Sequence, residues 1–443
     1  MAIYIIITFF IITFLYLSYI FNHYDIMSPS CIFCAMFTIT AILSCYMAYD
    51  NGINSFSGLT LFVLLTGVLA FCLGDWAVKY KIKNNYSQLT RIDISILKIF
   101  LIILFDVFIV YWTQNEISRI VKSSGYTGAS IMTYYRYLSS YSTYEESING
   151  TLNQLSKICT TSAYVFGFVF VNNVIILKNK SIKDYLLLAP IVLSVYITLL
   201  SGGRSGLIGY IVSMVFIAFT LMSINNNWIH KDNAKLLFKL IIVFIVSLVA
   251  FYFTSIIVGR NNVTSEHTIL NYFVKYFGES IYNFDCYITN PPSCNKYFGQ
   301  ETLSGIYGAL RKLGLTDINY IIHLEFRTLP NGTSSGNVYT FFRRLIQDYG
   351  IVLMYVFTFI ISLIYSYVYK RKIVGKPFCR KTVINMLVYS YFLRLIFMSS
   401  FDQTIFVYLS LGAIIYTIVL YVVFVFLIEI HFTGRKIVWK KMN

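Results

Sequence analysis

Arginine side chains lie at or near the ends of several long apolar runs of this sequence. Arg204 follows two glycines between two such runs, and Arg260 follows Gly259 at the end of a third. A guanidinium group keeps its charge at every relevant pH and can donate two parallel hydrogen bonds to phosphate oxygens. We therefore predict that arginines bind a phosphate or diphosphate group, with Arg204, Arg260, Arg327, Arg343, Arg344 and Arg394 as the candidates. The alternative for each is an interfacial anchor whose charged end reaches water.

Carboxylates and a histidine in the same part of the chain could move protons. The candidates for a general base are Glu279, Asp317, His323 and Glu325, because a carboxylate or a neutral imidazole can take a proton from a hydroxyl group within hydrogen-bond reach. His323, Glu325 and Arg327 occupy alternate positions, so an extended segment would place their side chains on one face. The sequence contains no Asp-x-Asp, no glycine-rich phosphate loop and no His-x-x-x-His. We therefore expect neither a bound metal ion nor a cofactor.

Two groups of cysteines could have chemical roles. Cys31 and Cys34 have the C-x-x-C spacing, but no second pair completes a metal site, so we expect them to pack as small apolar residues. Cys286 and Cys294 flank a Pro-Pro turn in a segment that we place outside the cytoplasm. A disulfide bond and two free thiols are equally consistent with that position.

The elements that must position these residues are membrane-spanning helices. Of 443 residues, 57% are hydrophobic and 12% are charged, whereas soluble domains average roughly 45–50% and about 25%. This composition excludes an ordinary water-soluble protein. Apolar runs long enough to cross a bilayer predict an all-α integral membrane protein with about eleven spans, near 2–21, 30–49, 58–77, 97–114, 158–177, 185–201, 205–222, 238–258, 349–369, 383–399 and 404–428.

The basic residues predict the orientation of these spans. The connections 79–98, 178–184, 230–239 and 370–382, together with the tail from Arg435, contain 21 of the 35 Lys and Arg residues. Cytoplasmic connections retain Lys and Arg, so we place these segments and the C-terminus in the cytoplasm and the N-terminus in the periplasm. The net charge of +16 therefore reflects topology, and we expect no nucleic-acid partner. We read 2–21 as a retained helix, since no basic region precedes it.

Two connections on the predicted outer side are long. Residues 115–157 form the first long periplasmic loop and 259–348 the second, within a single polytopic membrane domain of 1–443. A connection of about 90 residues is far longer than usual, which indicates a folded lid or cap. In it, Phe273, Phe277 and Ile281 recur at helical spacing and predict an amphipathic helix on the membrane surface. Asn290-Pro291-Pro292-Ser293 and Pro330-Asn331-Gly332 divide the rest.

Several short motifs carry a resemblance to a known family. They are Ser-Gly-Gly-Arg-Ser at 201–205, and Gly-Asn-Val-Tyr-Thr-Phe-Phe at 336–342 followed by Asp-Tyr-Gly at 348–350. With the many spans and arginine-rich outer loops, this resembles the Wzy family of O-antigen or oligosaccharide repeat-unit polymerases. The Arg-x10-Gly pattern of some members is absent. Each long loop instead has Arg-x8-Gly, at Arg119 to Gly128 and at Arg327 to Gly336.

The resemblance implies a GT-C-like bundle in the bacterial inner membrane and a role in lipopolysaccharide biosynthesis. Such a glycosyltransferase would move a growing glycan from undecaprenyl diphosphate onto a new lipid-linked repeat unit at the periplasmic face. Arginines would stabilise the diphosphate leaving group. The implied partners are undecaprenyl-diphosphate-linked glycans, membrane lipids, a Wzz-type chain-length regulator and a Wzx-type flippase. The alternatives are an O-antigen ligase, which uses the same donor, and a lipid-linked oligosaccharide flippase or other transporter.

Overall fold

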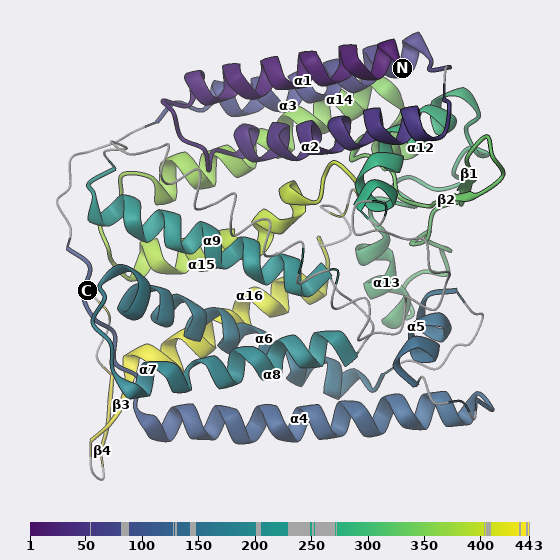
Figure 1. The fold of residues 1–443 in the computed structure, drawn as a ribbon. Coiled ribbons are helices and arrows are strands. Elements are labelled where there is room, and N and C mark those ends of the chain that lie inside the picture. The colour runs from purple at the N-terminus through teal and green to yellow at the C-terminus, as the bar shows by residue number, and fades with distance from the viewer. Residues whose placement is uncertain are drawn as a thin grey trace. The chain divides into compact units, whose positions relative to one another are not determined.

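The computed structural model covers residues 1–443 and describes all of them except 54, 81–87, 127, 129–130, 142–147, 201–204, 229–248, 250–251, 253–270, 272, 403, 405–408, 434–435, 440–441 and 443. Within the described part the chain is mostly helical (Figure 1). Contacts divide it into two compact units. Unit 1 comprises Met1–Lys81, Glu266–Val374 and Arg394–Ile414, and unit 2 comprises Ile82–Ser265, Gly375–Leu393 and Ile415–Asn443.

Unit 1 contains the first three long helices and the second long inter-span segment. Its elements are α1 (Ala2–Phe21), α2 (Pro29–Asp50), α3 (Gly58–Ala77), a π-helical turn (Val274–Gly278), α12 (Glu279–Thr289), α13 (Ser304–Lys312), β1 (Arg327–Thr328), β2 (Ser334–Gly336), α14 (Phe342–Val368) and a second π-helical turn (Tyr369–Ile373). Helix α1 packs against α2 and α3, and α3 packs against α14 (Figure 1). Strands β1 and β2 pair antiparallel.

Unit 2 is built mainly from α4, α6, α8 and α9. Its elements are α4 (Ile96–Ser123), α5 (Ile131–Tyr141), α6 (Gly150–Phe170), a π-helical turn (Val171–Ile176), α7 (Ile182–Leu186), α8 (Leu188–Leu200), α9 (Ser205–Asn225), a π-helical turn (Val425–Glu429), β3 (Ile430–Thr433) and β4 (Lys436–Trp439). Helices α15 (Arg380–Phe397) and α16 (Leu411–Phe424) each contribute residues to both units. Helix α4 packs against α5, α6 and α8.

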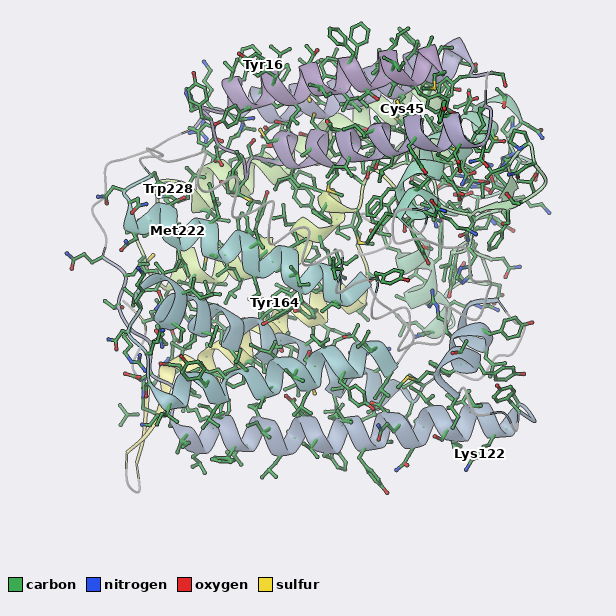
Figure 2. The ribbon with its side chains drawn as sticks, viewed as in Figure 1. Tyr16, Cys45, Lys122, Tyr164, Met222 and Trp228 are labelled. Carbon is green, nitrogen blue, oxygen red and sulfur yellow. The ribbon has the colours of Figure 1, made fainter. Side chains whose placement is uncertain are left out.

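Aromatic side chains fill part of the interior of unit 2. Tyr164 of α6 is buried and meets the rings of Tyr210, Tyr391 and Tyr416 edge to face (Figure 2). Tyr391 and Tyr416 stack with ring centroids 3.7 Å apart. By contrast, Tyr16 of α1 points outward and is exposed, as expected for a helix face that contacts lipid.

Nine helices in the described part of the chain are long and apolar enough to cross a membrane, which is the character of a multi-pass membrane protein. They coincide with nine of the predicted spans. Predicted span 383–399 is helical as α15, although three of the 18 residues of this helix are charged. Predicted span 238–258 lies almost entirely outside the described residues. The count of eleven therefore stays a prediction.

One predicted span ended too early, because helix α4 continues from the predicted end at 114 to Ser123. Helix α14 starts at Phe342, but its helical backbone is interrupted at Gly350 (φ 78°, ψ 170°), next to the predicted span start at 349. Ile117 and Ile120 are buried while Glu116 and Arg119 form an ion pair on the opposite, more exposed face. Hydropathy alone marks the end of a span where polar residues begin, but an amphipathic helix continues through them.

The amphipathic helix predicted around 273–281 does form, but the prediction that it lies on the membrane surface was wrong. Phe277 and Ile281 are buried, because this segment packs against α2. Ser44 donates a hydrogen bond of 2.6 Å to the carbonyl oxygen of Gly278. A Cβ atom at Gly278 would lie 2.8 Å from the carbonyl oxygen of Leu43, so only glycine allows this approach.

A buried polar network connects the helices of unit 1 at one end. Asp75 of α3 accepts hydrogen bonds from Asn22 and Ser30, and its carboxylate lies 2.9 Å from the ammonium group of Lys370. Asp75 and Lys370 are both almost completely inaccessible to solvent. Burial of either charge alone would cost free energy. The pair therefore fixes the position of α3 relative to the π-helical turn that follows α14.

Close packing of α3 against α14 depends on small side chains. A Cβ atom at Gly74 would lie 2.5 Å from the backbone oxygen of Phe359 and 2.8 Å from the Ser362 side chain. Small residues let two membrane helices approach closely and gain van der Waals contact.

We expect Gly74→Val to destabilise the protein by roughly 1–3 kcal/mol, because the added atoms overpack this interface. Gly58→Val provides a matched control, since Gly58 begins the same helix and a Cβ atom there meets nothing within 4 Å. Thermal unfolding of the detergent-purified proteins measures the difference. Equal melting temperatures for the two variants would contradict the close packing.

Candidate functional site

Arg343 is the centre of a charged cluster in unit 1. It lies in the first turn of α14 and is only 1% exposed, yet its guanidinium group forms ion pairs with Glu301 and Glu325. The bond to Glu325 is 2.6 Å long, and Glu301 is 2% exposed. The rings of Tyr287 and Tyr339 lie 4.8 and 5.4 Å from the guanidinium carbon, within range of cation–π attraction.

Glu325 connects this buried arginine to a more accessible one. Its other carboxylate oxygen lies 3.1 Å from Arg327, which also donates hydrogen bonds to the Tyr339 hydroxyl and the Asn290 carbonyl oxygen. Of His323, Glu325 and Arg327, which the sequence predicted on one face, this contact confirms the placement of Glu325 and Arg327. Burial would raise the pKa of Glu325, but Arg343 and Arg327 prevail and hold it below its ordinary value. Glu325 thus stays ionised, which makes it a weak general base.

Arg344, the next residue in α14, adds further contacts to the cluster. It donates hydrogen bonds to the backbone oxygens of Ile321 and Ile322, and its Nε atom lies 3.9 Å from Asp402. Among the described residues, three arginines thus face three carboxylates, namely Arg327, Arg343 and Arg344 against Glu301, Glu325 and Asp402. The cluster is therefore close to neutral, and a bound diphosphate would have to compete with these carboxylates for the guanidinium groups.

Asp348 holds the loop that presents Glu301. Its carboxylate accepts hydrogen bonds from the backbone N–H groups of Glu301 and Thr302, from the Thr302 hydroxyl and from the Asn295 amide. Asp348 lies one and a half turns along α14 from Arg343, so one helix positions both the arginine and its partner. Glu301 and this role of Asp348 were not predicted. Only the Asp-Tyr-Gly motif at 348–350 had singled out the position.

Glu279 differs from the other predicted bases. It begins α12, is 5% exposed, and its Oε2 atom has no hydrogen-bond partner among the described residues. Burial raises the pKa of Glu279 from 4.5 to about 8, and Lys275 only partly opposes this. A buried carboxyl group with a pKa near neutrality and one unoccupied oxygen has the properties of a general base or acid.

The turn at 398–402 connects Glu279 and Arg344. Ser280, next to Glu279, donates a hydrogen bond of 3.0 Å to the Ser400 carbonyl oxygen, and Asp402 faces Arg344. The backbone N–H of Phe341 donates to the Ser399 oxygen at 2.8 Å, which ties the start of α14 to the same turn. The base candidate and the arginine cluster are thus joined within unit 1 through a single short turn.

The remaining predicted site residues are less informative. Asp317 and His323 are exposed, and His323 lies in the extended segment that leads to Glu325. Arg394 of α15 is half-buried and close enough to Tyr365 to interact electrostatically. Arg204 and Arg260 lie outside the described residues. The diphosphate-binding role of all six arginines stays a prediction.

The two Arg-x8-Gly patterns have different structures. Arg327 and Gly336 are directly opposite each other on β1 and β2. Arg119 instead pairs with Glu116 within α4, and Gly128 lies in the connection beyond that helix. The patterns are therefore not structural equivalents. Cys286 and Cys294, whose pairing the sequence left open, are both free thiols.

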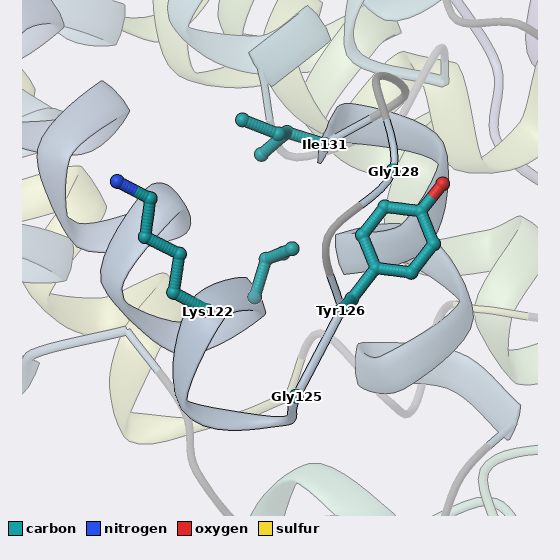
Figure 3. Close-up of a pocket in the computed structure, with 6 residues that line it drawn as sticks. Lys122, Gly125, Tyr126, Gly128 and Ile131 are labelled. Carbon is teal, nitrogen blue, oxygen red and sulfur yellow. The ribbon is translucent and has the colours of Figure 1, made fainter.

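A pocket lies near Gly128, in unit 2. It has a volume of about 450 Å³ and is lined by Val121, Lys122, Gly125, Tyr126, Gly128 and Ile131 (Figure 3). The Tyr126 ring stacks on Tyr134 of α5 with centroids 3.9 Å apart. An aromatic wall beside a lysine suits a polar, ring-shaped ligand. Of the lining residues, only Gly128 belongs to a motif noted in the sequence.

Comparison with known proteins identifies no relative: no protein-family model, no curated protein and no solved structure matches this chain.

The raised pKa of Glu279 predicts a pH-dependent stability. Between pH 4.5 and 8 the unfolded chain has lost the proton that the folded protein keeps, so this group lowers the unfolding free energy by up to about 1.4 kcal/mol per pH unit. Above pH 8 the loss stops. We expect Glu279→Gln to match the wild type near pH 4.5 and to become progressively more stable than it up to pH 8.

Thermal unfolding at a series of pH values measures this difference. Asp50→Asn, which removes an exposed carboxylate at the end of α2, controls for the loss of a negative charge. A constant difference between Glu279→Gln and wild type across the range would contradict a buried, protonated Glu279.

Proposed function

We propose that this protein is a glycosyltransferase that polymerises undecaprenyl-diphosphate-linked oligosaccharide repeat units into O-antigen or a related surface polysaccharide. The observation that supports the proposal is the buried carboxyl group of Glu279, whose Oε2 atom has no hydrogen-bond partner among the described residues and which the 398–402 turn joins to a cluster of arginines. Such a transfer requires a base, which takes a proton from the acceptor hydroxyl, and several cations, which stabilise the departing diphosphate.

In the proposed reaction, an acceptor hydroxyl oxygen attacks the anomeric carbon of the donor glycan. The bond from that carbon to the diphosphate oxygen breaks, and the lipid diphosphate leaves with the bonding electrons. Glu279, in its ionised form, takes the hydroxyl proton. Its pKa of about 8 lies close to the operating pH, where a base is most effective.

The arginines have two roles in this proposal. Arg343, which is almost completely buried between Glu301 and Glu325, supports the site. Arg327 is partly exposed, and Arg344 is buried but lies beside the partly exposed Asp402; both would contact the diphosphate, with Arg204, Arg260 and Arg394 as further candidates from the sequence. A near-neutral cluster favours a transient contact, in which the arginines stabilise the charge that develops as the diphosphate leaves.

Deletion of the gene tests the proposed function, with lipopolysaccharide analysed on a gel. We expect a lipid A core that carries one repeat unit, and wild-type complementation should restore the ladder. Complementation with Glu279→Gln should reduce polymer roughly 10²-fold or more, as for loss of a general base, and Arg327→Ala should reduce it more than Arg327→Lys, which keeps the charge but not the fork geometry.

Asp50→Asn is the matched control, and every variant should reach wild-type abundance in the membrane. A core without any repeat unit in the deletion strain would indicate a ligase or a flippase instead. A normal ladder from Glu279→Gln would remove Glu279 from the mechanism.

We also propose a location and a membrane orientation for the protein. The protein would lie in the bacterial inner membrane with its N-terminus and the 259–348 segment in the periplasm and its C-terminus in the cytoplasm, because the basic connections 230–239 and 370–382 would stay inside. A reporter that is active only in the cytoplasm should therefore be silent when fused at Asn331, between β1 and β2. Activity at that position would reverse the orientation, whereas fusion at the C-terminus should be active.

A further inference from the structure

Large apolar side chains are exposed in the part of unit 1 that lies between its spans. Leu313 is 65% exposed, Leu315 is 69% exposed and Phe298 is 65% exposed, and Ile306, Ile322 and Phe326 are also exposed. None of these residues belongs to one of the nine membrane-spanning helices. Large apolar patches on a water-facing surface usually mark an interaction site.

These side chains belong to one packed substructure. The Tyr307 hydroxyl of α13 donates a hydrogen bond of 2.6 Å to the Phe298 carbonyl oxygen, and the backbone N–H of Ile321 donates to the Gln300 oxygen at 3.0 Å. Gly308 of α13 lies against the Tyr320 ring. The residues before α13, α13 itself and the residues after it thus form a single surface, here called the α13 surface (residues 297–326).

Helix α13 is amphipathic, and two apolar side chains on one side of it are exposed. They are Ile306, within the helix, and Leu313, the residue that caps its C-terminus, which lies seven residues further on. The segment around Phe277, which was predicted to lie at the membrane surface, is instead buried against α2.

The α13 surface is continuous with a lipid-facing helix. The Phe298 ring lies 4.8 Å from Tyr349, and Tyr349 lies 4.7 Å from Phe357, both in α14. On α14, Val352 is 75% exposed, which is expected of a residue in contact with lipid. The aromatic chain from Phe357 to Phe298 therefore leads from the membrane-spanning part of α14 to the α13 surface.

Exposed basic side chains lie beside these apolar ones. Arg311 and Lys312 occupy the last turn of α13 and are exposed, as is Lys296. Among the acidic residues of this stretch Asp317 is exposed, whereas Glu301 is buried against Arg343 and the partly buried Glu325 is paired with Arg343 and Arg327. Basic residues beside exposed leucine and phenylalanine match a membrane surface, where apolar side chains enter the acyl boundary and cations meet lipid phosphates.

We propose that the α13 surface docks on the phospholipid bilayer that holds the spans, with Leu313, Leu315 and Phe298 at the acyl boundary and Arg311 and Lys312 at anionic headgroups. The docking would hold the long 259–348 segment against the membrane. This docking is independent of the proposed function, because the experiment that tests it measures contact with lipid and requires no enzymatic activity.

Spin labels on the full-length protein test the proposal. Cys45, Cys286, Cys294 and Cys379, which are at least partly exposed, are replaced by serine, and single cysteines are introduced by Leu313→Cys and Leu315→Cys. Val352→Cys on α14 is the lipid-facing control and Ser334→Cys on β2 is the exposed control. Each labelled protein is reconstituted into vesicles of phosphatidylethanolamine and phosphatidylglycerol. Collision rates of the label with oxygen, which concentrates in lipid, and with a water-soluble nickel chelate are then measured.

We expect the oxygen-to-nickel ratio at Leu313 and Leu315 to be severalfold higher than at Ser334 and to approach the value at Val352. A ratio equal to that at Ser334 would mean that the surface faces water, and low rates with both reagents would mean that a protein partner or a second copy covers it. Either result overturns the proposal. Omitting phosphatidylglycerol should lower the ratio at Leu313, and an unchanged ratio would overturn the headgroup contact.

Discussion

The burial of the Arg343 guanidinium group is the constraint on which the second long segment of this protein depends. A charge removed from water has to be paired, and losing one partner of a buried pair costs roughly 3–5 kcal/mol. Glu301 and Glu325 come from two separate stretches of the segment, so both stretches are held at the start of α14. Asp348, in turn, binds the backbone around Glu301. Four charged residues thus organise a connection whose described part consists of short helices and two short strands.

The same cluster explains why two glutamates in one unit have opposite properties. Glu325 lies between two arginines, which lower its pKa against the effect of burial. Burial raises the pKa of Glu279, and Lys275 opposes this only in part. One carboxylate therefore serves as a fixed negative charge, while the other is able to exchange a proton near neutral pH. Pairs of acids whose environments separate their pKa values are typical of acid–base sites.

The spans could be predicted from the sequence because twenty consecutive apolar residues have few alternatives to a membrane helix. The end of α4 could not, since Glu116 belongs to a helix that continues past its apolar run. Within the site, the contact between Glu325 and Arg327 followed from their alternate positions. The partner of Arg343 did not, because Glu301 lies 42 residues earlier and only the folded segment brings them together. Likewise, helical spacing revealed an apolar face at Phe277 but not that α2 would cover it.

The pair of Asp75 and Lys370 bears on how the chain is assembled as it is made. The two residues are 295 positions apart, so α1, α2 and α3 enter the membrane long before the lysine has been synthesised. During that interval Asp75 has only hydrogen-bonding partners such as Asn22 and Ser30, and its buried carboxylate lacks the cation with which it is later paired. Arrival of α14 would then bring the compensating cation. The N-terminal helices would therefore reach their final packing only after most of the chain has been inserted.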